Sequence, residues 1–296
     1  MAGTAALRGR ASPTESRLGF GLLRVGRRTF GYLLLIAVAA VTVLPFLWMV
    51  LGAFKDQGQL YIYPPKFIPK PWDFSNFGKV AAAIPLGIML FNSVKITVLA
   101  TLGALVSSSL AAYGFSRLHF FGRDKLFLVL LATMMIPGQV TMIPVFLVMR
   151  QLGWINTHYP LIVPDWFGWA FAIFLLRQFF LTISSEIEDA AKIDGANPFQ
   201  IYRRIFIPLS RPALATLAVF AFMGNWNDLL RPVIYLSTFE QMTLTVGLAS
   251  FNGMHRVDYH LIMAASVISV LPIMVVFMSA QRYFVRGVAL SGGLKG

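Results

Sequence analysis

The chain has 296 residues, of which 57% are hydrophobic and 12% are charged, and its formal net charge is +13 at pH 7. A soluble globular chain carries about 25% charged residues, so this composition excludes an ordinary soluble enzyme, a disordered chain and a coiled coil. Cysteine is absent from the sequence, which excludes a disulfide framework, a thiolate nucleophile and a cysteine-based metal site.

Six apolar runs are long enough to cross a bilayer, because a hydrocarbon core of roughly 30 Å requires about 20 apolar residues in a helix. They cover approximately residues 31–54, 88–116, 126–149, 159–181, 213–236 and 261–281. Polar residues interrupt the fourth and fifth runs. Pro137, Gly138 and Pro144 interrupt the third, where a static packing kink is favoured over a gate. The sequence therefore predicts an all-α membrane protein with six transmembrane helices in a domain over 29–290.

Lysine and arginine are unequally distributed between the two sides that these runs define. The segment before the first run has six, the loops after the second and fourth runs have three and five, and the last segment has three, against six on the opposite side. The positive-inside rule then places both termini in the cytoplasm. Residues 1–28 are predicted to form a mostly disordered basic tail, with an amphipathic helix on the membrane as the alternative. The positive charge is expected to face anionic lipid, and no nucleic-acid partner is predicted.

Motifs of catalysis and of energy conversion are missing from the sequence. It has no G-x-x-x-x-G-K-[ST] phosphate loop, no H-E-x-x-H and no G-x-S-x-G. We therefore predict that the chain is not an enzyme, has no catalytic residues, holds no metal and carries no cofactor of its own. A pore without an energy source needs a partner that supplies energy. A stand-alone secondary transporter is the alternative, although no internal inverted repeat is visible.

The predicted cytoplasmic loop 182–212 has the features of a docking surface. Ser185 and Glu188 form an S-x-x-E capping-box pattern, which predicts a short helix that begins there. Gly195 is a candidate left-handed cap for the end of this helix. A second short helix is predicted to follow and to stop at Pro208, where proline ends a helical run. Two short helices with a glycine elbow would form a compact knob; an interfacial loop without a partner is the alternative.

The same loop resembles the EAA loop of binding-protein-dependent ABC importer permeases. Its residues Asp189-Ala190-Ala191, Gly195, Ile205 and Ile207-Pro208 keep the spacing E-A-A-x3-G-x9-I-x-L-P, with aspartate for the glutamate and isoleucine for the leucine. Other segments resemble sugar-type permeases, among them Ala112-Tyr113-Gly114-Phe115-Ser116-Arg117-Leu118, Arg177-Gln178-Phe179-Phe180 and Trp226-Asn227-Asp228. From about Gly31 to Gly296 the chain is most similar to the maltose-type second permease subunit of the carbohydrate-importer group.

The resemblance implies a fold, a location and a set of partners. It implies the ABC importer type I permease fold in the bacterial cytoplasmic (inner) membrane. It implies a heterodimer with a second permease subunit, two ATP-binding subunits that hold ATP and Mg, an extracytoplasmic solute-binding protein and a carbohydrate substrate. Residues 237–260 would face the binding protein, and the tail 291–296 would reach the ATPase interface. The residues then predicted to couple to the ATPase are Glu188, Asp189, Ala190, Ala191, Asp194, Gly195, Ile205 and Pro208.

A polar group lies in the fifth apolar run, where polar side chains are costly unless they face protein or water. Asn225, Trp226, Asn227 and Asp228 are therefore the candidate substrate path, since an aromatic ring beside amide and carboxylate groups suits a sugar. Hydrogen bonding between helices, with Asp228 and Arg231 paired at i,i+3, is the slightly favoured alternative. The resemblance implies that the partner permease makes most of the substrate contacts.

Overall fold

The computed structural model of the chain describes residues 13–251 and 258–292. The predictions for residues 1–12, for the centre of the 237–260 loop and for residues 293–296 lie outside the described residues. Within the described part every regular element is a helix and none is a strand, so the all-α prediction is confirmed there.

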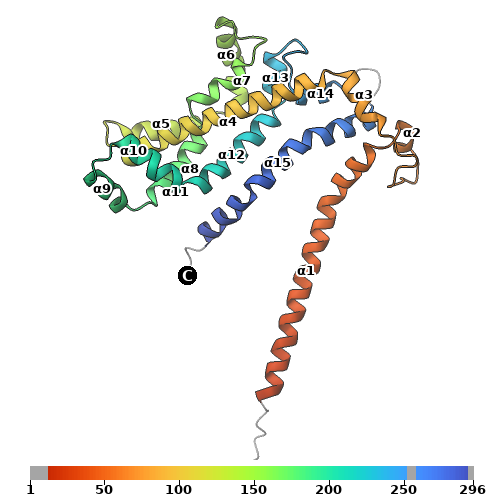
Figure 1. Cartoon of the computed structure of the whole chain (residues 1–296), viewed down its shortest axis with the longest axis horizontal. Helices are drawn as coiled ribbons and strands as arrows, with labels where there is room; N and C mark the ends of the chain where they lie inside the picture. Colours follow the sequence, from red (N-terminus) through yellow and green to blue (C-terminus); the bar gives the residue numbers. More distant parts are fainter. Residues whose placement is uncertain (1–12, 252–257, 293–296) are drawn as a thin grey trace, which may run out of the picture.

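The helices are, in chain order, α1 Pro13–Gly52, α2 Gln57–Leu60, α3 Ser75–Ala83, α4 Leu86–Arg117, α5 Arg123–Thr133, α6 Gly138–Gln151, α7 Tyr159–Ile162, η1 Pro164–Phe167, α8 Ala170–Leu181, α9 Ser185–Ile193, α10 Pro198–Ile201, η2 Tyr202–Phe206, α11 Ile207–Leu209, α12 Arg211–Trp226, α13 Leu230–Tyr235, α14 Leu244–Ser250 and α15 Tyr259–Gly292. Helix α4 runs through the molecule and packs most extensively against α8 and α12. Helices α9 and α10 lie at one end of it, and α2 and α3 lie at the other (Figure 1).

Four helical segments are long and apolar enough to cross a membrane: Arg28–Gly52, Leu86–Arg117, Tyr159–Leu181 and Tyr259–Ser279. Two bent pairs pass the same test, Arg123–Thr133 with Gly138–Gln151 at 99° and Pro198–Leu209 with Arg211–Trp226 at 78°. Within the described residues the count reaches the predicted six when each bent pair is taken as one span, although the second pair begins at Pro198 and so includes part of the predicted loop 182–212.

Two predicted spans are not continuous helices. The third breaks between α5 and α6, because Pro137 has no N–H to donate and disfavours the helical conformation at the residue before it. The break is therefore larger than the kink that the sequence suggested, whereas Pro144 lies inside α6 without ending it. The fifth run, 213–236, is divided into α12 and α13, and the polar residues after Trp226 separate them.

Both terminal helices are longer than the sequence predicted. Helix α1 begins at Pro13, so the tail is helical from that residue, whereas the sequence left open a mostly disordered tail or an amphipathic helix on the membrane. Helix α15 continues to Gly292 rather than ending near residue 281. Once a long apolar segment has nucleated a helix, each added residue gains a backbone hydrogen bond at low cost. Arginine, which is frequent in the tail, is also a good helix former.

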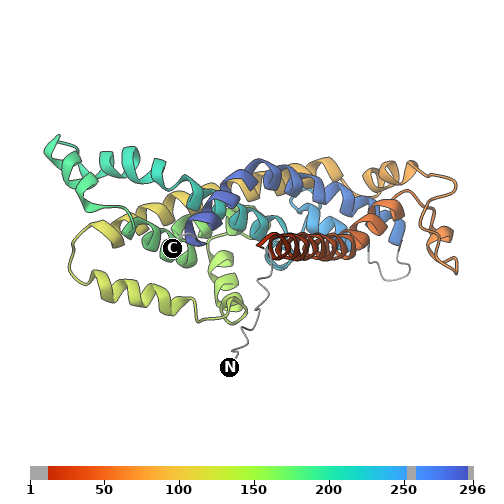
Figure 2. The same ribbon diagram turned by 90° about the horizontal axis from the view of Figure 1, so that it is seen from below.

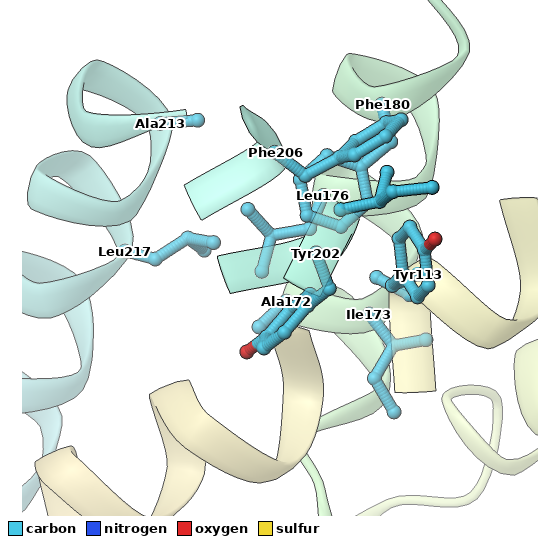
Figure 3. Close-up of a cluster of buried hydrophobic side chains, with 11 residues drawn as sticks. Tyr113, Ala172, Ile173, Leu176, Phe180, Tyr202, Phe206, Ala213 and Leu217 are labelled. Atoms are coloured by element: carbon cyan, nitrogen blue, oxygen red, sulfur yellow. The ribbon is translucent and has the colours of Figure 1, made fainter. Parts of the chain in front are cut away.

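The core lies among the later helices and leaves α1 outside it. In the most apolar window of α1 none of the residues is buried, whereas 44% of the residues in the most apolar window of α4 are buried. Helix α1 leaves the other helices near its C-terminal end and extends away from them (Figure 1), and the turned view shows a flat, elongated molecule (Figure 2). The largest buried cluster joins α4, α8, η2 and α12 beside the loop 182–212 (Figure 3).

Candidate functional site

The predicted helix of the loop 182–212 is present as α9, and its caps explain its limits. Its N-cap is Ser184, whose side chain accepts a hydrogen bond from the Glu186 N–H. The predicted capping box of Ser185 and Glu188 is therefore wrong, because the cap lies one residue earlier and the Glu188 carboxylate points toward Arg117. The existence of the helix and its end near Asp194 are confirmed.

Gly195 makes the sharp turn that the sequence predicted. Its φ is +79°, a left-handed conformation that costs little only for glycine. The Gly195 N–H donates to the Lys192 carbonyl at 3.0 Å, and the Ala196 N–H donates to the Ala191 carbonyl at 2.9 Å. These two bonds form a Schellman motif, which satisfies the last carbonyls of α9 and reverses the chain.

The second helix of the loop begins immediately after this turn. Asn197 and Gln200 form a capping box, in which each side chain accepts from the other residue's backbone N–H at 2.9 Å. The sequence analysis predicted this second helix but did not identify Asn197 as its cap. The helix also does not stop at Pro208, because η2 is a π-helical turn and α11 continues to Leu209.

The two helices leave an apolar and acidic surface without a partner in the described chain. Ile193 is 87% exposed, and Ile187 and Phe199 are also exposed. Asp189 lies on the solvent side and pairs with Lys192 at 3.3 Å. Hydrogen bonding to Glu188 and Asp189 raises the pKa of Lys192, so its ammonium remains charged at neutral pH. This knob, residues 184–209, presents small and apolar residues between charges, as a surface for a protein partner does.

The predicted coupling residues therefore fall into two groups. Asp189, Ala190, Asp194 and Gly195 are exposed, whereas Ala191 and Ile205 pack against the buried cluster and Pro208 is exposed on the second helix. Glu188 points into the molecule, toward Arg117 at 3.5 Å and Lys192 at 3.0 Å. The exposed residues can touch a docked protein directly, whereas the side chains of Glu188, Ala191 and Ile205 face the rest of the chain.

Aromatic side chains hold the knob on the bundle. Tyr113 of α4 contacts Tyr202 and Phe206, with ring centroids 5.4 and 5.1 Å apart. The Tyr202 hydroxyl and the Ser109 hydroxyl are hydrogen-bonded at 2.7 Å. Figure 3 shows Tyr113, Phe180 and Phe206 meeting where α4, α8 and η2 converge. Because these side chains are buried and interdigitated, the second helix of the knob is fixed to α4.

A cavity of about 440 Å³ lies at the opposite end of α8, lined by Ala104, Pro164, Asp165, Gly168, Trp169, Phe220, Ala221, Gly224, Asn225, Asp228 and Arg231. Arg231 organises its polar wall. Its guanidinium donates to Asp228, as the i,i+3 prediction expected, to the Asn225 side-chain oxygen at 2.7 Å and to Asp165 at 3.4 Å. We call Asp165, Asn225, Asp228 and Arg231 the polar network.

The sequence analysis missed one member of this network. Asp165 is one of the polar residues that interrupt the fourth predicted run, and η1 brings it beside Arg231 of α13. An isolated acid in an apolar run was the available signal, because such a residue requires a partner in a membrane. A second cavity, of about 320 Å³, is also lined by Asp228 and Arg231. The polar network therefore borders two cavities.

The four residues of the candidate substrate path are separated by the structure. Asn225 and Asp228 line the larger cavity. Trp226 is 2% exposed, and its indole N–H donates to the Ser269 carbonyl of α15 at 3.1 Å. Asn227 is exposed, and its amide donates back to the Met223 carbonyl at 2.9 Å. Trp226 therefore joins α12 to α15, and the side chain of Asn227 caps a carbonyl at the C-terminal end of α12.

We expect Trp226→Ala to destabilise the protein by about 3–5 kcal/mol, because a large buried side chain is removed. Trp226→Phe keeps most of the volume and loses one hydrogen bond, at a cost of about 1 kcal/mol. Thermal unfolding of the purified protein measures both. Trp166→Phe is the matched control, since the Trp166 indole also donates to a backbone carbonyl but its side chain is 50% exposed. Equal losses for the two phenylalanine variants would contradict the role of Trp226.

No group of three or more histidine, cysteine, aspartate or glutamate side chains in the described ranges 13–251 and 258–292 is arranged to hold a metal ion. The acids of the polar network are paired with Arg231 instead.

Comparison with known proteins identifies relatives over most of the chain. Residues 103–290 match the family model described as binding-protein-dependent transport system inner membrane component. A probable ABC transporter permease protein of Bacillus subtilis is 35% identical over 90% of this chain and 87% of its own length. The lactose transport system permease protein of Rhizobium radiobacter is 34% identical over 86% of this chain and 93% of its own. The trehalose/maltose transport system permease protein of Thermococcus litoralis is 31% identical over 88% and 94%.

The arrangement of helices also matches a solved structure. A chain of a bacterial ABC transporter involved in the import of the acidic polysaccharide alginate aligns with a TM-score of 0.75 and 25% identity. The alignment covers 94% of this chain and 100% of that chain. The predicted fold class, that of an ABC importer permease, is thereby confirmed.

Proposed function

The chain belongs to the family of binding-protein-dependent transport system inner membrane components, and on that premise we propose that it passes a sugar or oligosaccharide into the cell. It is the transport subunit of an ABC importer, and ATP hydrolysis belongs to a separate subunit. The relatives named for lactose and for trehalose/maltose support a carbohydrate substrate. The single observation that carries the mechanism is the exposed knob at 184–209, which has no partner in the described chain.

The knob is the proposed contact with the ATPase. Ile187, Ala190 and Ile193 offer a small and apolar surface on α9, with Asp189 beside them for a basic group of the partner. ATP, bound with Mg on the ATPase dimer, would close that dimer and displace the knob. The bundle behind the knob would then tilt and open the path toward the binding protein.

A second permease subunit and the surrounding lipid are the proposed neighbours of the helices. The exposure of α1 supports this, because a single chain leaves that helix without helical neighbours for most of its length. The excess of lysine and arginine around the knob supports a cytoplasmic position for it and for both termini. The external binding protein would then meet the opposite end, with α2, α3 and the described parts of 237–260.

The larger cavity is the proposed part of the sugar path in this subunit. It combines Trp169 with the carboxylates and the amide of the polar network. An aromatic ring suits the apolar C–H face of a sugar, and amide and carboxylate oxygens suit its hydroxyl groups. Trp226 and Asn227 are left out of this path because neither lines the cavity.

Reconstitution tests the proposal against a stand-alone carrier. The chain is expected to co-purify with a second permease and an ATPase, and vesicles containing this complex should take up solute only with internal ATP and external binding protein. The ligand that co-elutes with the binding protein identifies the solute, and a sugar is expected. Uptake driven by an ion gradient, with the purified chain alone, would overturn the proposal.

A further inference from the structure

Two of the segments that resemble sugar-type permeases lie outside the proposed docking surface. They stand at the C-terminal ends of two neighbouring helices, on the same side of the bundle. The segment 112–118 ends α4, and the segment 177–180 lies in the last turn of α8. Each contributes one arginine, and each arginine binds the other helix. Arg117 donates to the carbonyls of Phe180 and Ile183, both at 2.5 Å. Arg177 donates to the carbonyl of Phe115 at 3.2 Å. We call this reciprocal arrangement the arginine clasp.

The clasp matches the electrostatics of the two helix ends. The last carbonyls of a helix lack intrahelical donors and carry partial negative charge, so a cation is favourable there. The Arg117 side chain is only 11% exposed, and its guanidinium lies over the Phe206 ring at 4.9 Å. The guanidinium of Arg177 lies over the Phe127 ring, 4.3 Å from the ring centroid. A rigid, planar guanidinium can serve several acceptors at once, which a lysine ammonium on a flexible stem does less well.

Glu188 connects the knob to this clasp. One of its oxygens lies 3.5 Å from Arg117 and the other lies 3.0 Å from Lys192, and its side chain is 8% exposed. A buried carboxylate is costly without charged partners. The ion pair between Glu188 and Arg117 therefore fixes α9 beside the end of α4. The contacts of Tyr202 with Ser109 and Tyr113 bind the second helix of the knob to α4 independently.

The same helices reach the polar network at their other ends. The Trp169 N–H, just before α8, donates to the Ser108 hydroxyl of α4 at 2.9 Å. Trp169 lines the larger cavity, and Asp165 four residues earlier binds Arg231. Helices α4 and α8 are therefore joined at both ends of their contact, between the knob and the cavity.

We propose that the arginine clasp, through Glu188, makes α4, α8 and α9 one rigid unit, so that a displacement of the knob is delivered to the cavity rather than absorbed by the loop. Arg117, Arg177 and Glu188 are positioning residues in this inference, which rests on the proposed docking of α9 onto an ATPase. Without the clasp, α9 would move on the ATPase while α4 stayed behind.

The absence of cysteine from the sequence makes the unit directly measurable. Spin labels on Glu186→Cys of α9, which lies outside the proposed docking residues, and on Leu110→Cys of α4, both exposed positions, report the distance between knob and bundle in the assembled complex. The complex is studied in nanodiscs, with partner subunits freed of cysteine, without nucleotide and with a non-hydrolysable ATP analogue and Mg. The chain with the unaltered clasp is expected to give one narrow distribution of distances between the labels, and this distribution should be the same with and without nucleotide.

Glu188→Gln removes the ion pair with almost no change in shape and leaves the carbonyl contacts of Arg117 in place. It is expected to broaden the distance and to make it depend on the nucleotide. Arg117→Gln should do the same, and the double variant should be no worse than Arg117→Gln alone, because the two residues act through one contact. If the Arg117→Gln chain does not assemble into the complex, the Glu188→Gln variant alone tests the rigid unit. Arg123→Gln is the control, since its pair with Asp124 lies at the same end but Asp124 is exposed.

The outcomes separate this inference from the proposed function. A distance that changes with nucleotide in the unaltered chain, or one that stays narrow in Glu188→Gln, would overturn the rigid unit while leaving the docking intact. A purified complex that contains no ATPase subunit would overturn the proposed function itself, and the role of the clasp with it.

Discussion

Gly195→Val is expected to lower ATP-driven uptake at least about tenfold, the effect of roughly 1.4 kcal/mol on the coupled state. Gly195 has a φ of +79°, and an L-residue in that left-handed region costs about 1–2 kcal/mol, more for a β-branched one. No atom lies within 4 Å of a Cβ built there, so the strain is in the backbone. Relief of that strain would open the Schellman turn and change the angle at which α9 faces the ATPase.

Gly122→Val is the matched control for this experiment. Gly122 has a φ of +77°, and a Cβ at that position likewise meets nothing within 4 Å. The two variants should lose similar amounts of thermal stability, but only the Gly195 variant should lose uptake and the stimulation of ATP hydrolysis by the loaded binding protein. Survival of both activities in Gly195→Val would contradict a coupling role for the knob.

Arg231→Gln is expected to have the second large effect, through the polar network. The substitution leaves Asp165 and Asp228 in one cavity wall without their cation. Breaking a fully buried ion pair costs about 3–5 kcal/mol; because the Arg231 side chain is 36% exposed, we expect about 1–3 kcal/mol here. Uptake should fall at least about tenfold, since 1.4 kcal/mol already corresponds to that factor. Uptake assays and thermal unfolding of the same preparations measure the two effects.

Two further substitutions show which part of the network matters. Asp165→Asn removes the ion pair between η1 and α13 but keeps an oxygen acceptor there and the Asp228–Arg231 pair, so an intermediate loss is expected. Asn227→Ala is the control, because its exposed amide bonds only to a carbonyl of its own helix, and it should leave uptake and solute selectivity nearly unchanged. Full uptake by Arg231→Gln would reduce the network to a packing role.

The knob shows how much local sequence can specify. A capping serine, a glycine turn and a helix-ending proline each act within a few positions of the chain, so they predicted a two-helix loop before any tertiary contact was known. The first cap was still misplaced by one residue. Ser184 and Ser185 are equivalent as sequence, and Glu188 is taken out of the capping box by Arg117, 71 positions away in the chain.

The spans show the opposite dependence. Charge-free runs predicted where apolar helices lie, because a bilayer accepts only backbone that is internally hydrogen-bonded. They did not predict the 99° bend between α5 and α6 or the end of α12 at Trp226. Whether a proline kinks, breaks or merely occupies a helix depends on what packs against it, as Pro137 and Pro144 illustrate within one predicted span.

By itself the sequence determined that this is a helical membrane subunit with an exposed two-helix knob, since composition, run length and caps are properties of neighbouring residues. Only the tertiary structure decided which polar groups meet: Asp165 with Arg231, Glu188 with Arg117, and Trp226 with α15. Those partners come from separate helices, and burial makes each pairing necessary without indicating, in the one-dimensional pattern, which distant group will satisfy it.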